Sequence, residues 1–436
     1  MSEKAKPTKI ELIIIGGTWS VLPEAYKFWY IKECFKAANE FNSVILEGAQ
    51  RPIESRQDPI ALRRPADRSR MTKLKRQLLF EQKKNESAKY KIIGITLETR
   101  PDYIDEKELW EMRELGATRV ELGVQAIDDK ILKKNQRGHG VAEIAQATEM
   151  LKNFGFKVTY HIMPGLPGAT AKKDLAMFKK LFSDERFQPD QLKFYPTVVT
   201  RGSLLYKWWQ AGKYKPYPDK VLQNLIVECK KIIPPYVRVI RLIRDIPGES
   251  IVAGNLITNL RQVMKDRGVA CRCIRCREAG EKQLLINNYE LRIIKYPASG
   301  GEEYFLSYES KDGKILYGFC RLRLAFKNVI STPHFAGEKS LKDEYGKYKG
   351  FLPSVEMTNK TAMVRELHVY GELVPIGNKK IIQHAGLGKM LMAEAEKIAR
   401  KNGFKKIAVI AGVGVRGYYR KLGYRLNNTY MIKSLV

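Results

Sequence analysis

The sequence has 436 residues, 44% of them hydrophobic, which is enough for two or three globular domains. No apolar run reaches the roughly 18 residues that a membrane-spanning helix needs, so we expect a soluble, cytoplasmic protein with no membrane partner. The 78 Lys and Arg residues outnumber the 47 Asp and Glu residues and give a formal net charge of +31. This excess favours a nucleic-acid partner over the alternative of a solvated basic surface, as in some thermophilic proteins.

The first half of the chain alternates short apolar runs with amphipathic segments. Strands are predicted at 11–15, 91–98, 119–124, 157–163 and 191–195, and helices at 24–39, 106–115, 141–153 and 171–182. Repeated strand–helix units of this kind predict a parallel sheet that forms a barrel or a partial barrel. Ligands of such barrels bind at the carboxyl ends of the strands. The side chains that we expect at this mouth, as candidates to hold a cofactor or substrate, are Gly16, Gly17, Glu98, Gln125, His161 and Lys193. For His161, on an apolar strand, a satisfied core histidine is the alternative.

One stretch, 51–91, interrupts this pattern with 13 Lys or Arg residues against five acidic ones. Its first half lacks periodicity, which indicates a basic loop followed by a helix. We interpret the stretch either as a contact for RNA or as a solvated run of charge.

The cysteines are few and unevenly placed. Cys271, Cys273 and Cys276 form a C-x-C-x-x-C group, whereas the other three are scattered. Three thiolates at this spacing favour a tetrahedral structural Zn²⁺ with one further ligand. Cys320 is a candidate for that ligand, although it lies in an apolar strand, where a buried cysteine without a metal is the commoner interpretation. Reduced thiols and an iron–sulfur cluster remain alternatives. A metal here would pin the junction between two domains.

The last 150 residues predict a second α/β unit. Strands are expected at 289–296, 303–310, 315–325, 363–370 and 407–410, with an irregular stretch at 328–360 and an amphipathic helix at 388–401. The turn Gln383–Lys389 leads into that helix. Gly386 and Gly388 let a ligand approach the backbone, and the free N–H groups of the helix start suit a pyrophosphate.

Two further features accompany this turn. Glu366, on the preceding strand, is a candidate acid or base. Tyr418 and Tyr419 follow the next strand, and their hydroxyls are candidates to orient a thioester or protonate a leaving thiolate. The alternative for the tyrosines is that they only pack in the core. Together, these features predict an acetyl-CoA site.

The motifs resemble a known family. The Gln-x-x-Gly-x-Gly turn with the Tyr-Tyr-Arg-Lys-Leu-Gly-Tyr ending is similar to GNAT acetyltransferases, and Glu-Leu-His-Val-Tyr-Gly at 366–371 resembles the catalytic subunit of Elongator. Matching stretches include Ile-Gly-Gly-Thr at 15–18, Thr-Leu-Glu-Thr-Arg-Pro-Asp-Tyr at 96–103, Asn-x-Arg-Gly-His at 135–139 and Arg-Asp-Ile-Pro at 244–247. The resemblance implies an α/β fold, in which a partial TIM-like radical S-adenosylmethionine (SAM) barrel precedes a GNAT-type domain. We expect the barrel at 1–262, a zinc-binding linker at 263–284 and the acetyltransferase domain at 285–436.

The resemblance also implies a function, the start of carboxymethylation at C5 of the wobble uridine in tRNA, with acetyl-CoA and SAM as co-substrates. The implied partners are the anticodon stem-loop of tRNA and either a second copy of the chain or Elongator-type subunits. SAM or the uridine would be held by the mouth residues named above. The implied acetyl-CoA contacts are Lys9, Glu366, Leu367, His368, Val369, Gln383, His384, Ala385, Gly386, Leu387, Gly388, Lys389 and Tyr419, with Glu366, Tyr418 and Tyr419 as catalytic candidates.

The chain departs from the family in its cysteines. A radical SAM [4Fe–4S] cluster needs three closely spaced cysteines near the N-terminus, and only Cys34 precedes residue 229 here. We therefore expect a shortened form without the cluster-binding segment, which retains acetyl-CoA and tRNA binding but not the radical step. Two other functions are compatible with the motifs: acetylation of protein lysines, and tRNA binding without catalysis.

Overall fold

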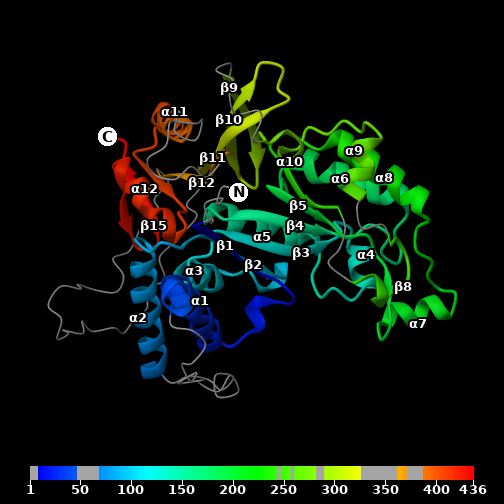
Figure 1. Ribbon diagram of the computed structural model, residues 1–436. Coiled ribbons are helices and arrows are strands. Elements are labelled where there is room, and N and C mark those ends of the chain that lie inside the picture. Colours follow the sequence, from blue (N-terminus) through cyan, green and yellow to red (C-terminus); the bar gives the residue numbers. More distant parts are fainter. Residues whose placement is uncertain are drawn as a thin grey trace.

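The computed structural model describes residues 8–46, 68–242, 247–256, 260–280, 289–325, 361–370 and 386–436 (Figure 1). Within these residues, the N-terminal half forms a six-stranded parallel sheet in the order β1-β2-β3-β4-β5-β7. Its strands are β1 (Lys9–Ile14), β2 (Lys91–Thr99), β3 (Arg119–Gln125), β4 (Lys157–Ile162), β5 (Gln191–Phe194) and β7 (Arg238–Arg241). The predicted partial barrel is confirmed, and its register places the ends of successive strands side by side.

Helices connect these strands, and four of them begin at side chains that a helix start favours. Asp105, Asp128, Thr170 and Ser203 each accept a hydrogen bond from a backbone N–H of the first turn that follows. The helices are α1 (Glu24–Leu46), α2 (Arg68–Asn85), α3 (Glu106–Glu114), α4 (Asp129–Lys134), α5 (Val141–Asn153), α6 (Ala171–Ser183), α7 (Leu204–Gln210), α8 (Asp219–Ile232) and α9 (Leu260–Asp266). A short pair, β6 (Val199–Thr200) and β8 (Ile251–Ala253), lies apart from the sheet. The helix expected after the basic loop is confirmed as α2, whereas residues 51–67 of that loop lie outside the described residues.

The C-terminal half forms a seven-stranded mixed sheet in the order β14-β15-β13-β12-β11-β10-β9. Its strands are β9 (Tyr289–Ala298), β10 (Gly301–Ser310), β11 (Leu316–Ala325), β12 (Thr361–Val369), β13 (Lys406–Val409), β14 (Arg425–Asn427) and β15 (Tyr430–Ser434). Helix α11 (Leu387–Lys401) packs its apolar face on β10, β11 and β12, and α12 (Arg416–Lys421) follows β13. The short helix α10 (Ile274–Arg277) lies in the linker between the two sheets.

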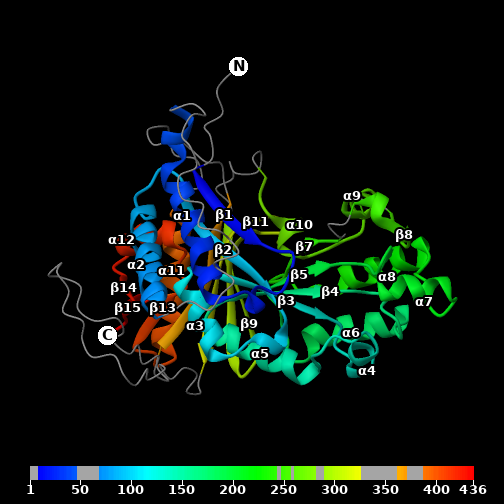
Figure 2. The same cartoon turned by 90° about the horizontal axis from the view of Figure 1, so that it is seen from below.

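The second sheet lies at the amino ends of the parallel strands, while α4, α6, α7 and α8 lie toward their carboxyl ends (Figures 1 and 2). Side chains from both halves share one apolar core, to which the second half contributes Phe319, Met363 and Tyr430 among others. A second core fills the space between α11 and its own sheet. The two halves are therefore packed together as well as linked. No helix among the described residues is both long and apolar enough to cross a bilayer.

Candidate functional site

Five successive strands contribute one residue each to a polar network at the barrel mouth. The carboxylate of Glu121 on β3 accepts a hydrogen bond from His161 Nε2 (2.8 Å) and pairs with Lys193. The other ring nitrogen of His161 lies 3.5 Å from Glu98, which in turn accepts a hydrogen bond from the backbone N–H of Gly16 (3.2 Å). Four of the predicted mouth residues are thus brought together, and Glu121, which holds them, stands opposite Glu98 in the sheet register. Gly17 follows Gly16 with open space around it.

Neighbouring side chains compensate the buried negative charge of Glu121. Burial alone would raise the pKa of Glu121, but the hydrogen bond from His161 and the positive charge of Lys193 outweigh it and lower the pKa below the usual value. Burial, followed by the negative charge of Glu121, raises the pKa of the neighbouring Tyr195 to about 12. The ring of Tyr195 stands edge-on to that of His161. His161 is therefore buried and satisfied by Glu121, as the core alternative expects, and it lies within a cluster of charged side chains at the mouth.

A second polar layer lies two residues before the first along the same strands, deeper in the half-barrel. Arg119 donates to Thr96 (2.7 Å), to Gln191 (3.2 Å) and to Glu11 (2.9 Å). Thr159 donates to the same Gln191 oxygen. The interior of the sheet is thus polar from the mouth toward the amino ends of the strands, where the second half of the molecule lies.

Gln125 lies beside this network and not within it. It has a positive φ of 66°, and its backbone carbonyl pairs with Met163 at the end of β4. Among the described residues, the Gln125 Oε1 atom and the Nε atom of Arg137 are buried without a hydrogen-bond partner. The two side chains lie close to Gly123, where an added Cβ atom would lie 3.0 Å from Gln125 Nε2 and 3.5 Å from a terminal nitrogen of Arg137. Buried polar groups without partners are costly, so this pair fits a polar ligand that satisfies them.

Arg137 was missed as a candidate. It belongs to the Asn-x-Arg-Gly-His motif at 135–139, which served in the sequence only as evidence for the family resemblance. Sequence spacing gives no sign that the turn after α4 folds back over the ends of β2 and β3. The motif itself was the available signal, since binding residues often lie on loops that a rigid scaffold positions.

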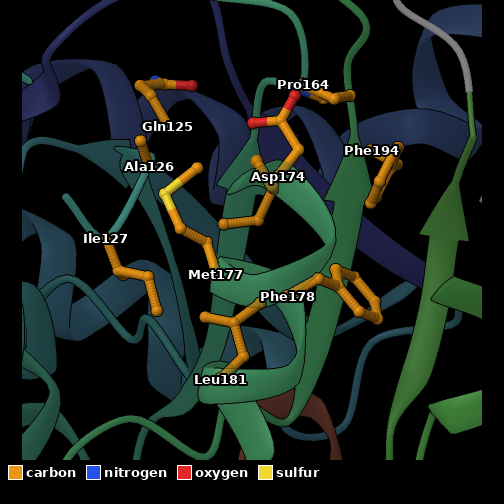
Figure 3. Close-up of a pocket in the computed structure, with 10 residues that line it drawn as sticks. Gln125, Ala126, Ile127, Pro164, Asp174, Met177, Phe178, Leu181 and Phe194 are labelled. Atoms are coloured by element: carbon orange, nitrogen blue, oxygen red, sulfur yellow. The ribbon is translucent and has the colours of Figure 1, made fainter. Parts of the chain in front are cut away.

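A small cavity lies between α6 and the sheet, next to Gln125 (Figure 3). Its lining is apolar except at one end, where Gln125 and Asp174 stand. The Asp174 carboxylate accepts hydrogen bonds from Tyr217 (2.7 Å) and from the backbone of Gly165 (2.8 Å), while burial raises its pKa to about 6. These contacts anchor the loop after β4 beneath α6.

In the second half, three predicted acetyl-CoA elements meet at the start of α11. Gly386 is its N-cap residue, with φ 79°, and as a glycine it offers no side chain to cap the first turn. A Cβ atom at Gly388 would lie 2.8 Å from the Tyr418 hydroxyl and 3.6 Å from Val369 on β12. The glycine thus leaves a gap bordered by backbone N–H groups, a strand end and a tyrosine. Leu387 is buried and Lys389 exposed, whereas Gln383, His384 and Ala385 lie outside the described residues.

Strand β12 has an open side along its second half. Its parallel pairing with β13 ends at Val364, whereas residues Glu366–Val369 pair with β11 alone. A register shift in the β11–β12 ladder marks the point where the strands separate. Among the described residues, backbone groups on the β13 side of Leu367, His368 and Val369 therefore have no strand partner, as an extended amide-bearing ligand requires.

The two tyrosines have different environments. Tyr418 is 39% exposed and faces Gly388, while Tyr419 is 6% exposed and lies in the core with Tyr424 and Leu391. Burial raises the pKa of both hydroxyls. The core alternative therefore describes Tyr419, whereas Tyr418 is the tyrosine that borders the gap at Gly388.

Glu366 is held in ion pairs. It accepts a hydrogen bond from Arg321 (2.9 Å) and lies 3.6 Å from Lys157 on β4. Burial opposes ionisation, but the charges of Lys157 and Arg321 prevail and lower its pKa to about 2. A carboxyl group with this pKa stays ionised at neutral pH, which favours a role for Glu366 in joining β12 to β4 over proton transfer. Lys9 lies at the exposed start of β1, paired in register with Lys91.

A cluster of buried charges joins the two halves. Asp190, just before β5, accepts two hydrogen bonds from Arg365 (2.5 and 2.9 Å) and one from the backbone of Val158 (2.8 Å). Arg365 also pairs with Glu303, and Lys152 lies within 3.7 Å of both carboxylates. None of these residues stands out in the sequence, since nothing in their spacing shows that they meet.

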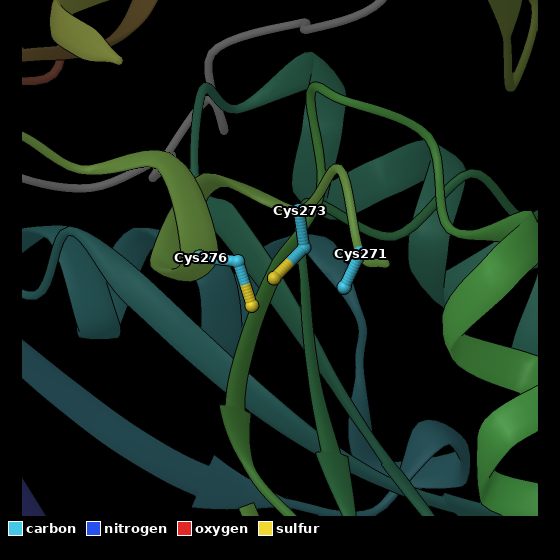
Figure 4. Close-up of side chains that lie close together, drawn as sticks. All are labelled: Cys271, Cys273 and Cys276. Carbon is cyan, nitrogen blue, oxygen red and sulfur yellow. The ribbon is translucent and has the colours of Figure 1, made fainter. Parts of the chain in front are cut away.

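The three linker cysteines converge around the start of α10 (Figure 4). Their Sγ atoms lie within 4.8 Å of one another, and no other His, Cys or acidic side chain of the described residues joins this group. Hydrogen bonds from Cys271 and Cys276 lower the pKa of Cys273. The prediction that Cys320 is the fourth ligand is wrong, because Cys320 does not lie with the other three thiols. It is buried in β11, where its neighbours include Glu366, Tyr418 and Tyr419.

The same segment is fixed to both halves of the molecule. Arg277 donates to the backbone of Pro235, ahead of β7, and pairs with Glu309 on β10 (2.7 Å). The backbone N–H of Ala279 donates to Leu316 on β11. A metal ion on the cysteines would therefore brace a junction that is already tied on two sides.

The described cysteines do not fit a [4Fe–4S] cluster at the barrel mouth. All six cysteines of the sequence lie in described residues, and only those of the linker group approach one another. Cys34 stands alone in α1, where burial raises its pKa to about 11. The thiolates that such a cluster needs are thus not gathered beside Glu98 and Gln125.

Comparisons with known proteins agree with this architecture. Residues 63–181 match the Radical SAM superfamily, and residues 189–267 match the Radical SAM C-terminal domain. The chain is 41% identical over 445 residues to a tRNA uridine(34) acetyltransferase of Dehalococcoides mccartyi, covering 100% of this chain and 85% of that protein. It is 37% identical to Elongator complex protein 3 of Homo sapiens, covering 98% and 70%. The solved structure of archaeal Methanocaldococcus infernus Elp3 with an N-terminus deletion (1-46) matches with a TM-score of 0.78 and 40% identity, over 98% of this chain and 90% of that one.

Proposed function

The chain belongs to the family of tRNA uridine(34) acetyltransferases and Elongator complex protein 3, and from this membership we propose that it binds acetyl-CoA and the anticodon stem-loop of tRNA to modify the wobble uridine at C5. The observation that carries the proposal is the gap at the start of α11, where Gly388, the open side of β12 and Tyr418 meet. Each group suits one part of acetyl-CoA.

In this proposal, the pyrophosphate lies against the uncapped first turn of α11, with Lys389 adding positive charge. The pantetheine arm runs along Leu367–Val369 and pairs with their free backbone groups. The thioester then lies beside the Tyr418 hydroxyl, which donates a hydrogen bond to the carbonyl oxygen or to the leaving thiolate. Glu366 keeps β12 against the barrel, and Tyr419 packs beneath Tyr418.

Charge and surface composition support tRNA as the partner. Helix α2 exposes Lys73, Arg76, Lys83 and Lys84 on the side away from α1. Phe80, on the same helix, is 66% exposed among these cations. Basic side chains that neutralise phosphates, together with an exposed ring on which a base can stack, are typical of single-stranded RNA contacts. Figures 1 and 2 show α2 at the outer edge of the molecule, beside α12.

Membership of the radical SAM superfamily implies SAM and a [4Fe–4S] cluster, and the two fit this chain differently. Gln125 and Arg137 offer buried, unpartnered atoms that suit the polar parts of SAM or of the uridine, next to Glu98 and Lys193. The cysteines do not suit the cluster. We therefore assign acetyl-CoA and tRNA binding to this chain and derive no step through the cluster.

Acetyl-CoA hydrolysis with and without tRNA tests the proposed function, and Tyr418→Phe tests its geometry. We expect tRNA to stimulate hydrolysis by the wild-type protein, and Tyr418→Phe to lower the stimulated rate by about 100-fold, the usual contribution of a positioned proton donor. Tyr419→Phe is the matched control on the same helix and should retain most activity, since that ring lies in the core. Equal losses in both variants would contradict the assignment to Tyr418.

The same assay separates the other functions. Hydrolysis or transfer that responds to lysine peptides but not to tRNA would identify a protein acetyltransferase. Tight tRNA binding without turnover would identify a scaffold. Neither outcome is expected, because the glycine gap and Tyr418 are both in place.

For the linker, we propose a structural Zn²⁺ on Cys271, Cys273 and Cys276, with the fourth ligand from outside the described side chains or from water. Removal of the metal by a strong chelator is expected to lower the melting temperature and to be reversed by zinc. Cys276→Ser should bind less zinc, measured by elemental analysis, whereas Cys229→Ser, a buried thiol outside the group, should bind as much as wild type. Zinc content that is unchanged in Cys276→Ser would contradict the proposal.

A further inference from the structure

The turn after β13 lies directly against β2 of the parallel sheet. A Cβ atom at Gly412 would overlap the carbonyl oxygen of Ile93 and lie 2.5 Å from its carbon. One at Gly414 would lie 2.6 Å from the Cβ of Lys91 and 2.9 Å from the carbonyl oxygen of Ile92. Gly412 has φ −65° and ψ 151°, a conformation that any residue adopts. The glycine is therefore required for space, because two backbones from different halves of the molecule touch there.

Burial and ion pairs on either side of this contact hold the turn against β2. Val413, between the two glycines, is 1% exposed and belongs to the core cluster under the parallel sheet. Three residues later, Arg416 pairs with Glu86 at the end of α2 (3.3 Å), and Arg420 pairs with the other oxygen of Glu86 (2.7 Å). Burial alone would raise the pKa of Glu86, but the hydrogen bond from Arg420 and the charge of Arg416 lower it, so the pairs persist at neutral pH.

The segment that is fixed in this way carries Tyr418. Residues 413–415 lead without interruption into α12, whose exposed tyrosine faces Gly388. The strand beneath the segment, β2, runs on to Glu98 in the network at the barrel mouth. From Ile93 to Glu98 the strand advances five residues, or about 17 Å. One strand thus touches the tyrosine-bearing loop at its beginning and contributes to the mouth at its end.

We propose that Gly412 and Gly414 are positioning residues, which set the place of Tyr418 relative to the barrel mouth by resting its loop on the backbone of β2. The inference rests on the proposed function, in which an acetyl group bound at α11 serves a nucleoside bound at the mouth. An added methyl group at either position must lift the loop from β2. Gly388 and the open side of β12, which hold the pyrophosphate and the pantetheine arm in the proposed function, would stay in place, but the position of Tyr418 relative to the mouth would change.

The test compares Gly412→Ala with Gly417→Ala. Gly417 lies in α12, five residues further on, and a Cβ atom there meets nothing within 4 Å. We expect Gly412→Ala to bind acetyl-CoA with the wild-type Kd but to lose about 100-fold in kcat for tRNA-stimulated hydrolysis, the effect of a displacement of about 1 Å. Gly417→Ala should keep both values. A general structural defect would instead weaken acetyl-CoA binding and turnover together.

Second-site changes sharpen the test. The contact of Gly414 includes a side-chain atom of Lys91, so Lys91→Gly is expected to restore part of the activity of Gly414→Ala. The three atoms nearest to a Cβ at Gly412 all belong to the main chain of Ile93 and Gly94, so Ile93→Gly should not rescue Gly412→Ala. Each double variant is compared with its own Lys91→Gly or Ile93→Gly background. Wild-type kcat in Gly412→Ala, or rescue by Ile93→Gly, would overturn the proposal.

Amide hydrogen exchange tests the positioning role independently of the proposed function. Gly412→Ala is expected to raise amide exchange in residues 411–415 and 91–94 and to leave α11 unchanged. If tRNA fails to stimulate wild-type hydrolysis, the proposed function fails, while the exchange data still decide whether the loop rests on β2. Unchanged exchange at these residues would overturn the positioning role.

Discussion

Asp190→Ala is expected to destabilise the protein by roughly 3–5 kcal/mol, because it removes a carboxylate that compensates buried cations from both halves. Arg365 loses both of its hydrogen bonds to this carboxylate, and Lys152 and Arg321, each 3.6 Å away, lose a counter-ion. The backbone N–H of Val158 also loses its partner. None of these groups can reach water without separating the two sheets. Thermal or urea unfolding of Asp190→Ala, in parallel with the wild-type protein, measures the loss of stability.

Glu228→Ala is the matched control for this change. Glu228 pairs with Lys231 on the surface of α8, where both side chains are at least half exposed, so its removal should cost less than about 1 kcal/mol. A similar loss in the two variants would contradict the structural importance of the Asp190 cluster.

The loss should depend on pH in a defined direction. Burial opposes ionisation of Asp190, but the charges of Arg365, Lys152 and Arg321 outweigh it and hold its pKa well below the usual value. A carboxyl group with a lowered pKa stabilises the folded state above its unfolded pKa of about 4 and loses that contribution as the pH falls further. The difference between wild type and Asp190→Ala is therefore expected to be complete at pH 7 and to shrink below pH 4. A difference that grows in acid would contradict this assignment.

Glu121→Ala is expected to have the second large effect, in this case at the barrel mouth. It leaves Lys193 buried without its counter-ion and His161 without its hydrogen-bond acceptor, which should cost roughly 3–5 kcal/mol. Replacement of both partners, as Glu121→Leu with Lys193→Met, removes the unpaired charge and should restore most of this stability. Melting temperatures of the single and double variants measure the difference.

The double variant also separates structure from function. If the mouth holds a ligand through its charges, Glu121→Leu/Lys193→Met should be stable but should lose the stimulation of acetyl-CoA hydrolysis by tRNA. Wild-type stimulation in a stable double variant would show that the network serves stability alone.

Local patterns predicted most of the elements correctly. The helix at 141–153 and the strands that begin at residues 91, 119, 157 and 191 appear at the expected places. Apolar periodicity decides these elements because each buries one face or one stripe whatever its neighbours are. The glycine turn before α11 was also visible, since a left-handed N-cap and a close approach both require glycine there.

Pairings between distant segments could not be predicted in this way. Cys320 was chosen as a zinc ligand from its chemistry alone, yet its strand places it among Tyr418 and Tyr419. Glu366 was a candidate acid or base, but Arg321 and Lys157 reach it from β11 and β4. The environment of a side chain sets its pKa, and that environment comes from residues far away in the sequence.

The sequence by itself thus determined the succession of two α/β units, the candidate residues at the mouth and at the start of α11, and the cysteine group of the linker. These follow from periodicity, turn chemistry and ligand spacing, all of which act within a few residues. Only the tertiary structure decided how the two units meet, through Asp190 and Arg365 in one contact and Gly412 on β2 in another. The partners of the buried charges, and the backbone that Gly412 approaches, lie on the opposite half of the molecule. The roles of these residues therefore become visible only when the two halves are packed together.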